Sequence, residues 1–83
     1  MTTSPVLFYW RPGCGFCSSL KRALVARGVE LDEHDIWQDA DAAAFVRSVA
    51  RGNETVPTVV VGDRAMVNPS PDDVVRALAD AAT

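Results

Sequence analysis

The sequence predicts an α/β fold whose elements follow the order β-α-β-α-β-β-α. Short apolar runs typical of buried strands alternate with segments whose apolar residues recur every three to four positions, as on one face of a helix. A Gly62-Asp63 turn between the last two runs predicts a hairpin. The 83 residues suffice for one small core, so we expect a single domain over residues 1–83.

The first strand and the first helix are the clearest elements. The run Pro5–Trp10 predicts a strand, with a proline at its start, where a missing N–H is tolerated. A helix is predicted from about residue 15 to 27, and Gly28 is a typical residue just beyond a helix end. The apolar stripe expected on this helix consists of Phe16, Leu20, Ala23 and Leu24.

The second strand is expected within Val29–Trp37 and has an imperfect pattern. Val29 and Leu31 alternate, but Ile36 falls on the other phase, which predicts a bulge or an early strand end. We expect Trp37 to be a packing residue. His34 is expected to be a surface or half-buried strand residue without a function.

A second helix is predicted from about residue 40 to 51. Asp39 or Asp41 can cap its N-terminus, because carboxylates accept hydrogen bonds from the first turn. Its expected apolar stripe consists of Phe45, Val46 and Val49.

The last part of the chain predicts a hairpin and a helix. Thr58–Val61 is a β-branched run typical of a buried strand, and Ala65–Val67 is its expected antiparallel partner. Ser70 is a candidate N-cap with Pro71 at the first helical position. The residues expected on the core side of this helix are Val74, Val75, Leu78 and Ala82.

The two cysteines of the chain, Cys14 and Cys17, lie where the first strand gives way to the first helix. Unpaired N–H groups and the helix macrodipole favour a negative charge there. A free thiol has a pKa of about 8.5, and C-x-x-C cysteines at helix N-termini fall to roughly 3.5–7.5. Cys17 lies one turn further on the same side of the helix. Cys14 is therefore the candidate attacking thiolate and Cys17 the candidate resolving thiol.

Other roles for the cysteine pair are weaker. A structural disulfide across two residues closes a very short loop and constrains the unfolded chain little. A zinc site requires four ligands, whereas the chain offers two cysteines and one histidine, so we expect no metal site.

Composition limits the expected partners and location. The net charge is −3, which argues against nucleic acid, because phosphate binding needs clustered cations. The chain has no apolar run of membrane-spanning length, and its N-terminus lacks the pattern of a signal peptide. We therefore expect a cytoplasmic protein, a setting in which a C-x-x-C pair is more often catalytic than structural.

The element order, with C-x-x-C after the first strand and Thr55-Val56-Pro57 before the third, resembles the thioredoxin fold in its glutaredoxin form. The resemblance covers nearly the whole chain. It implies a four-stranded mixed sheet flanked by three helices, with strand order 3-1-2-4 and an antiparallel fourth strand. It also implies a cis peptide at Val56-Pro57, which would expose the backbone of Val56 to a bound thiol substrate beside Cys14.

The resemblance further implies substrate-binding residues around the cysteines. Arg11 matches a basic position that many glutaredoxins use for the carboxylate of the substrate or for the thiolate. Phe16 stands where glutaredoxins have an aromatic residue. Glutaredoxins carry Gly-Gly and a polar-acid pair before the last helix, whereas this chain has Val67-Asn68 and then Pro69-Ser70-Pro71. The candidate substrate-binding residues are Arg11, Phe16, Thr55, Val56, Pro57, Asn68 and Ser70.

The departure before the last helix makes the chain most similar to mycoredoxins. These glutaredoxin-like proteins act on mixed disulfides of mycothiol, a thiol without a γ-glutamyl group. The resemblance implies an oxidoreductase without a tightly bound cofactor that uses mycothiol, or glutathione, as cosubstrate. Its expected partners are proteins carrying mixed disulfides and the reductase of the small thiol, and we expect a monomer.

Two other functions remain open within the resemblance. A redoxin that donates electrons to protein disulfides by way of thioredoxin reductase would use the same cysteines, although Met66–Pro71 lacks the Trp-Ser-Gly-Phe-Arg-Pro segment of the redoxins that serve ribonucleotide reductase. An iron–sulfur cluster carrier would hold a cluster between two chains. Such carriers often have Ser at the second cysteine position, so Cys17 favours electron transfer. A pure protein-interaction module is the third possibility, and the C-x-x-C pair argues against it.

Overall fold

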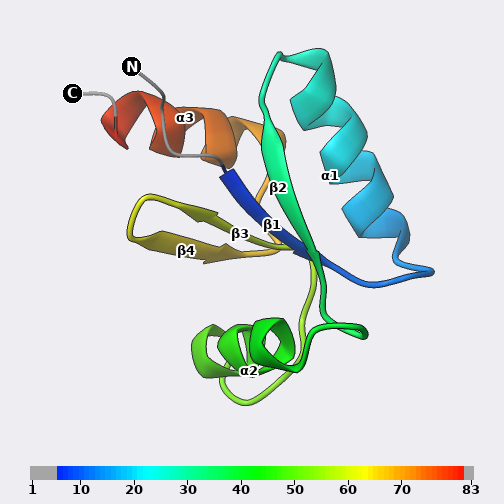
Figure 1. Ribbon diagram of the computed structural model, residues 1–83. Helices are drawn as coiled ribbons and strands as arrows, with labels where there is room; N and C mark the ends of the chain where they lie inside the picture. The colour runs from blue at the N-terminus through cyan, green and yellow to red at the C-terminus, as the bar shows by residue number, and fades with distance from the viewer. Residues whose placement is uncertain (1–5, 82–83) are drawn as a thin grey trace.

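Four strands and three helices follow one another in the predicted order (Figure 1). The computed structural model describes residues 6–81, so Pro5 and Ala82 lie outside the described residues. The elements are β1 (Val6–Trp10), α1 (Gly15–Ala26), β2 (Leu31–Asp35), α2 (Ala40–Val49), β3 (Thr58–Val61), β4 (Arg64–Val67) and α3 (Pro71–Ala81).

The strands form one mixed sheet in the order β2-β1-β3-β4. β2 is parallel to β1, β3 is antiparallel to β1, and β4 is antiparallel to β3. The expected order 3-1-2-4 correctly placed strand 1 between strands 2 and 3, but it was wrong for β4, which pairs with β3. The expected antiparallel direction of β4 holds for its pairing with β3, but the strand that runs opposite to β1 and β2 is β3. The two-residue turn Gly62-Asp63 gives β4 no length of chain with which to cross the sheet.

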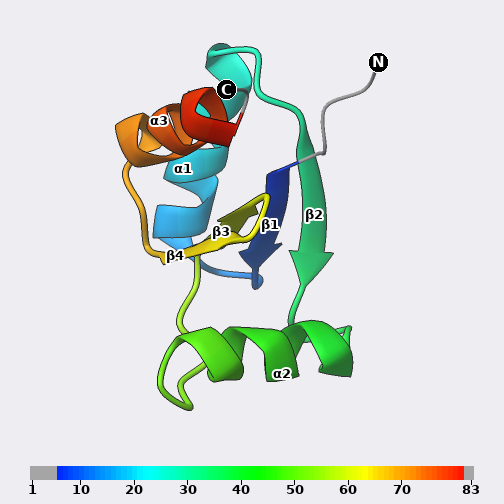
Figure 2. The ribbon, with the colours of Figure 1, turned by 90° about the vertical axis from the view of Figure 1, so that its left-hand side faces the viewer.

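The helices cover both faces of the sheet (Figures 1 and 2). α1 and α3 lie on one face and α2 on the other. Successive side chains of a strand point to opposite faces, so Val6 and Phe8 pack on the α1/α3 side while Leu7 and Tyr9 pack toward α2. The apolar run that predicted β1 is therefore a strand covered on both sides.

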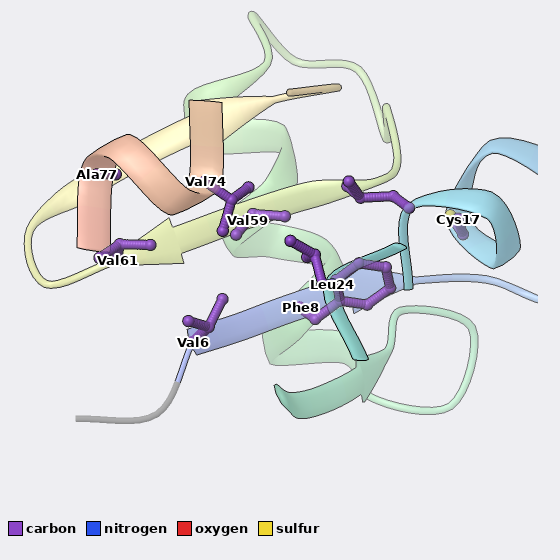
Figure 3. Close-up of a cluster of buried hydrophobic side chains, with 9 residues drawn as sticks. Val6, Phe8, Cys17, Leu24, Val59, Val61, Val74 and Ala77 are labelled. Atoms are coloured by element: carbon purple, nitrogen blue, oxygen red, sulfur yellow. The ribbon is translucent and has the colours of Figure 1, made fainter. Parts of the chain in front are cut away.

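Each face has its own cluster of buried side chains. The cluster beneath α2 consists of Tyr9, Ile36, Ala42, Ala43, Val46, Ala50 and Val60. The cluster beneath α1 and α3 (Figure 3) consists of Val6, Phe8, Cys17, Leu20, Leu24, Val59, Val61, Val74 and Ala77. Because Cys17 belongs to this second cluster, the packing of the core fixes the position of its sulfur.

Two apolar helix residues that were predicted to face the core are exposed instead. Phe16 is 74% exposed, because the buried stripe of α1 begins at Cys17 and continues one turn at a time through Leu20 and Leu24. Val75 is 39% exposed, because the core side of α3 is formed by Val74 and Ala77, and Val75 points about 100° away from Val74.

β2 ends early, as one of the two alternatives predicted. Its last residue is Asp35, and the N–H of Ile36 donates to the carbonyl of Trp10 at 2.9 Å. Trp37 is 62% exposed, so the expectation that it is a packing residue was wrong. The backbone N–H of Trp37 donates to the side chain of Asp35 at 2.9 Å in the turn that follows the strand. The indole side chain of Trp37 points away from the core. His34 is half-buried, as expected.

Short polar side chains cap α2 and α3. Oδ1 of Asp39 accepts the N–H groups of Asp41 and Ala42, so Asp39 is the cap rather than Asp41. Ser70 Oγ accepts the N–H of Asp73 at 3.1 Å, and Oδ2 of Asp73 accepts the N–H of Ser70 at 3.0 Å. This reciprocal pair stabilises the start of α3 and confirms the predicted N-cap.

Candidate active site

Cys14 is the N-cap of α1. Its backbone is extended, with φ −90° and ψ 104°, and its Sγ accepts the N–H of Cys17 at 3.1 Å. Its carbonyl accepts the N–H of Ser18 and so begins the helix. The first turn of α1 lies wholly within the described residues and contains no acidic side chain. A negative charge on Cys14 would therefore meet a helix N-terminus without a competing carboxylate.

The two cysteines form a disulfide and differ in exposure. Their Cα atoms are 5.2 Å apart. Cys17 is 3% exposed, whereas Cys14 is half-buried at the rim of the same cluster. In the reduced protein a substrate disulfide would reach the outer sulfur first. This difference supports the assignment of Cys14 as the attacking residue and Cys17 as the resolving residue.

The loop before β3 lies beside Cys14. The Val56-Pro57 peptide is cis, as the resemblance implied, and the carbonyl oxygen of Val56 is 3.9 Å from Cys14 Sγ. Two hydrogen bonds fix the loop: Thr58 Oγ1 donates to the carbonyl of Thr55 at 2.8 Å, and the N–H of Asn68 donates to the carbonyl of Pro57 at 2.7 Å. The structure thus brings together the backbone of residues 55–57 and the first cysteine.

Phe16 and Asn68 meet in a groove between α1 and the segment that joins β4 to α3. The groove has a volume of about 180 Å³ and is also lined by Ser19, Leu20, Pro69 and Pro71. Asn68 adopts φ 51°, a left-handed conformation that asparagine tolerates better than most residues. Ser70 does not line this groove, and its hydroxyl is the cap of α3.

Arg11 lines a different and larger cleft, which Cys14 also lines. This α1–β2 cleft has a volume of about 320 Å³ and is lined by both cysteines together with Trp10, Arg11, Lys21 and Glu33. The guanidinium of Arg11 lies 5.5 Å from the ring centroid of Trp37, and its Nη1 donates to the carbonyl of Pro12 at 3.2 Å. The structure therefore separates Arg11 from Phe16 and Asn68, which the resemblance grouped as one substrate site.

Sequence reasoning missed Trp37, Lys21 and Glu33 as residues of this region. Lys21 is the only lysine of the chain and follows Cys17 by four positions, a spacing that places both on one face of a helix. Glu33 could be placed only with the strand register, which sets it opposite Phe8. Trp37 gave no signal beyond its position after the second strand.

The groups with a shifted pKa, Tyr9 and Asp73, do not belong to the cysteine site. Burial raises the pKa of the Tyr9 hydroxyl, and the nearby carboxylates of Asp32 and Asp39 raise it further. The hydrogen bond from the backbone of Ser70 lowers the pKa of Asp73, with a smaller contribution from the Ser70 side chain. Neither group lines the α1–β2 cleft.

Residues 6–81 show neither a metal-ligand cluster nor a membrane-spanning helix. Within this part of the chain no three His, Cys, Asp or Glu side chains gather as metal ligands. The helices of the same region are too short or too polar to cross a membrane.

Comparison with known proteins identifies the family. The glutaredoxin family model matches residues 6–66. A Mycobacterium tuberculosis protein described as a glutaredoxin is 45% identical over 75 residues, which is 89% of either chain. Mycoredoxin 1 of Corynebacterium glutamicum is 42% identical over 60 residues, covering 72% of this chain and 73% of that protein.

A solved structure of similar fold agrees with these relatives. The glutaredoxin-like NrdH-redoxin of Escherichia coli superimposes with a TM-score of 0.75 at 29% identity, covering 88% of this chain and 93% of that chain. The match confirms the thioredoxin-like fold. Together with the paired cysteines at the start of α1, these comparisons show that the chain belongs to the glutaredoxin family, whose members are thiol–disulfide oxidoreductases.

Proposed function

We propose that this protein reduces mixed disulfides between cytoplasmic proteins and a low-molecular-weight thiol, and that this thiol is mycothiol. The observation that carries the proposal is the asymmetric cysteine pair. Cys14 lies half-buried at the helix N-terminus beside the Val56 carbonyl, and Cys17 is held in the core one turn away. The outer sulfur is accessible to a capped cysteine of another protein, and the inner sulfur can reach only Cys14.

The reaction has two steps. In the first, the Cys14 thiolate attacks the sulfur of the small thiol, and the protein thiolate leaves with the electron pair of the broken bond. Cys14 then carries the small thiol. In the second, either another small thiol releases Cys14 or Cys17 attacks it and forms the Cys14–Cys17 disulfide, the pairing that the structure contains. The small thiol or its disulfide is finally restored by a dedicated reductase.

The choice of mycothiol has two supports. The segment 67–71 replaces the Gly-Gly and polar-acid pair with which glutaredoxins hold a γ-glutamyl group, and Ser70 is committed to the cap of α3. A relative covering most of the chain is a mycoredoxin. The protein acts as a monomer in this proposal. Arg11 in the α1–β2 cleft, and Phe16 and Asn68 in the separate groove beside α1, are the contacts for the small thiol and the protein substrate.

The deciding experiment measures turnover of one synthetic mixed disulfide with mycothiol and with glutathione, each coupled to its own reductase. Turnover with mycothiol and background rates with glutathione are the expected result. The Cys14→Ser variant provides the background. Efficient turnover with glutathione would contradict the choice of mycothiol and identify a glutaredoxin with an altered last loop.

A second candidate is a redoxin that serves protein disulfides directly. The structural similarity to the NrdH-redoxin, a protein described as having a thioredoxin-like activity profile, favours it. Rapid reduction of the Cys14–Cys17 disulfide by thioredoxin reductase, with no turnover by either small thiol, would select this candidate over the first.

A further inference from the structure

The Lys21–Glu33 ion pair lies in the same cleft as the two cysteines. Nζ of Lys21 is 3.0 Å from Oε2 of Glu33, and both residues line the α1–β2 cleft. Lys21 follows Cys17 by one helical turn and shares its face of α1. Glu33 is the register partner of Phe8, so its side chain points to the face of the sheet that α1 covers. The fold therefore brings a carboxylate from β2 to the cleft that borders the resolving sulfur.

The resolving step creates a need for a proton acceptor. Cys17 is 3% exposed, and its thiol must lose a proton before or while its sulfur attacks Cys14. The titratable and charged groups lining the cleft are Arg11 from the β1–α1 loop, Lys21 from α1, Glu33 from β2 and the two cysteines. Arg11 and Lys21 are cations and have no free acceptor, and Cys14 is bound to the small thiol at this stage. Glu33 is the one carboxylate among these groups.

We propose that Glu33, held in place by Lys21, accepts the proton of Cys17 when Cys17 resolves the mixed disulfide on Cys14. This inference rests on the second, dithiol branch of the proposed function. The Cys17–Cys14 sulfur bond forms, the bond between Cys14 and the small thiol breaks, and the small thiol leaves as a thiolate with the electron pair. The cysteine pair is oxidised, the small thiol is reduced, and the proton passes from Cys17 to the carboxylate and then to solvent.

The dimensions of the cleft suit transfer through water. Its volume of about 320 Å³ accommodates several water molecules of roughly 30 Å³ each. A general base can act through one water molecule, and such catalysis contributes roughly 100-fold to 10,000-fold in rate. The Glu33 side chain is about one-third exposed, so the proton can continue to bulk solvent.

The resolving step can be isolated with a chromogenic disulfide. Reduced protein is mixed with excess dithiobis-nitrobenzoate in a stopped-flow instrument. Attack by Cys14 releases a first thionitrobenzoate, and attack by Cys17 on the resulting adduct releases a second. The second phase is identified by its independence of reagent concentration, and it isolates the attack of Cys17 on the adduct at Cys14.

Glu33→Gln is the test variant and Asp32→Asn its matched control. Asp32 is the neighbouring carboxylate on β2, but it points to the opposite face, where its Oδ2 is 3.4 Å from Nε2 of His34. We expect Glu33→Gln to lower the ratio of the second-phase to the first-phase rate by at least about tenfold at neutral pH. Glu33→Asp should recover part of this loss, and Asp32→Asn should leave the ratio unchanged.

The pH profile separates proton transfer from a structural effect. With Glu33 as acceptor, we expect the second-phase rate to change little between about pH 6 and 8. In Glu33→Gln the rate should rise close to tenfold per pH unit, because it then follows the thiolate fraction of Cys17. Parallel profiles for Glu33→Gln and Asp32→Asn would overturn the proposal. A missing second phase in the wild type would overturn it too, while turnover with mycothiol would still test the proposed function independently.

Discussion

The backbone N–H of Cys17 donates a 3.1 Å hydrogen bond to Sγ of Cys14. This contact joins the two functional sulfur positions through one turn of helix, because Cys14 is the N-cap of α1 and Cys17 lies in its first turn. In the reduced protein we expect the same N–H to face the thiolate of Cys14, and hydrogen bonds to charged acceptors are stronger than neutral ones. The helix that buries Cys17 should thus also stabilise the reactive form of Cys14.

Removing one cysteine at a time should separate the two steps of the reaction. We expect Cys14→Ser to reduce turnover of a mixed disulfide to background, because no accessible thiolate remains. Cys17→Ala should still remove the small thiol by the monothiol route. Alanine is the better replacement at this position, since serine would place a hydroxyl in an apolar cluster. Turnover is measured by coupled reductase assay, and an inactive Cys17→Ala variant that is correctly folded would rule out the monothiol route.

Arg11 should assist ionisation of Cys14. Both residues line the α1–β2 cleft, and Trp37 holds the guanidinium through its ring. We expect Arg11→Ala to raise the midpoint of thiolate formation, because a cation near the sulfur favours the charged thiol. The measurement is thiolate absorbance against pH. Arg22→Ala, an exposed cation of α1, is the control, and equal midpoints for both variants would exclude Arg11 from this role.

Phe16 should contribute to substrate binding rather than to stability. Its ring is 74% exposed and lines the groove shared with Asn68. We expect Phe16→Ala to raise KM for a protein substrate severalfold while the free energy of unfolding changes by less than about 0.5 kcal/mol. Val25→Ala removes another exposed apolar side chain of the same helix. If both variants change KM equally, the groove does not bind the substrate.

Leu24 and Val25 are a matched pair for testing the core. Leu24 is fully buried beneath α1, and its neighbour Val25 is 56% exposed. We expect Leu24→Ala to reduce the free energy of unfolding by about 2–5 kcal/mol, because the substitution leaves a cavity in a packed cluster. Val25→Ala should change it by less than about 0.5 kcal/mol. Urea denaturation measures both, and similar values would contradict the assigned face of α1.

Asp73 should make stability depend on acidity. Hydrogen bonds from Ser70 lower the pKa of this carboxyl in the folded protein. A lowered folded pKa contributes stability above the unfolded pKa, and this contribution is lost as the pH falls through the folded value. We therefore expect the unfolding midpoint of Asp73→Ala to fall less than that of the wild type as the pH decreases through the pKa range of carboxyl groups and below it. An acid dependence equal to that of the wild type would contradict a role for the cap of α3.

The sequence alone predicted the order of the elements, the family, the cap Ser70, and the position of the cysteines between strand and helix, whereas it left Asp39 and Asp41 as alternative caps of α2. These features depend on residues within a few positions of one another: apolar periodicity, hydrogen bonds of a first turn, and the C-x-x-C spacing. The family motif added the cis peptide before Pro57, which no local pattern of apolar residues could have shown.

Which elements lie side by side depends on long-range contacts that the three-dimensional structure shows. Phe8 pairs with Glu33 on one side and with Val59 on the other, and these partners are far away in the chain. Strand order, the outward positions of Phe16 and Trp37, and the meeting of Lys21 and Glu33 beside the cysteines all follow from such long-range pairing. Periodicity gives the face of a strand or helix relative to its own axis, whereas the neighbour on that face is set by how the whole sheet assembles.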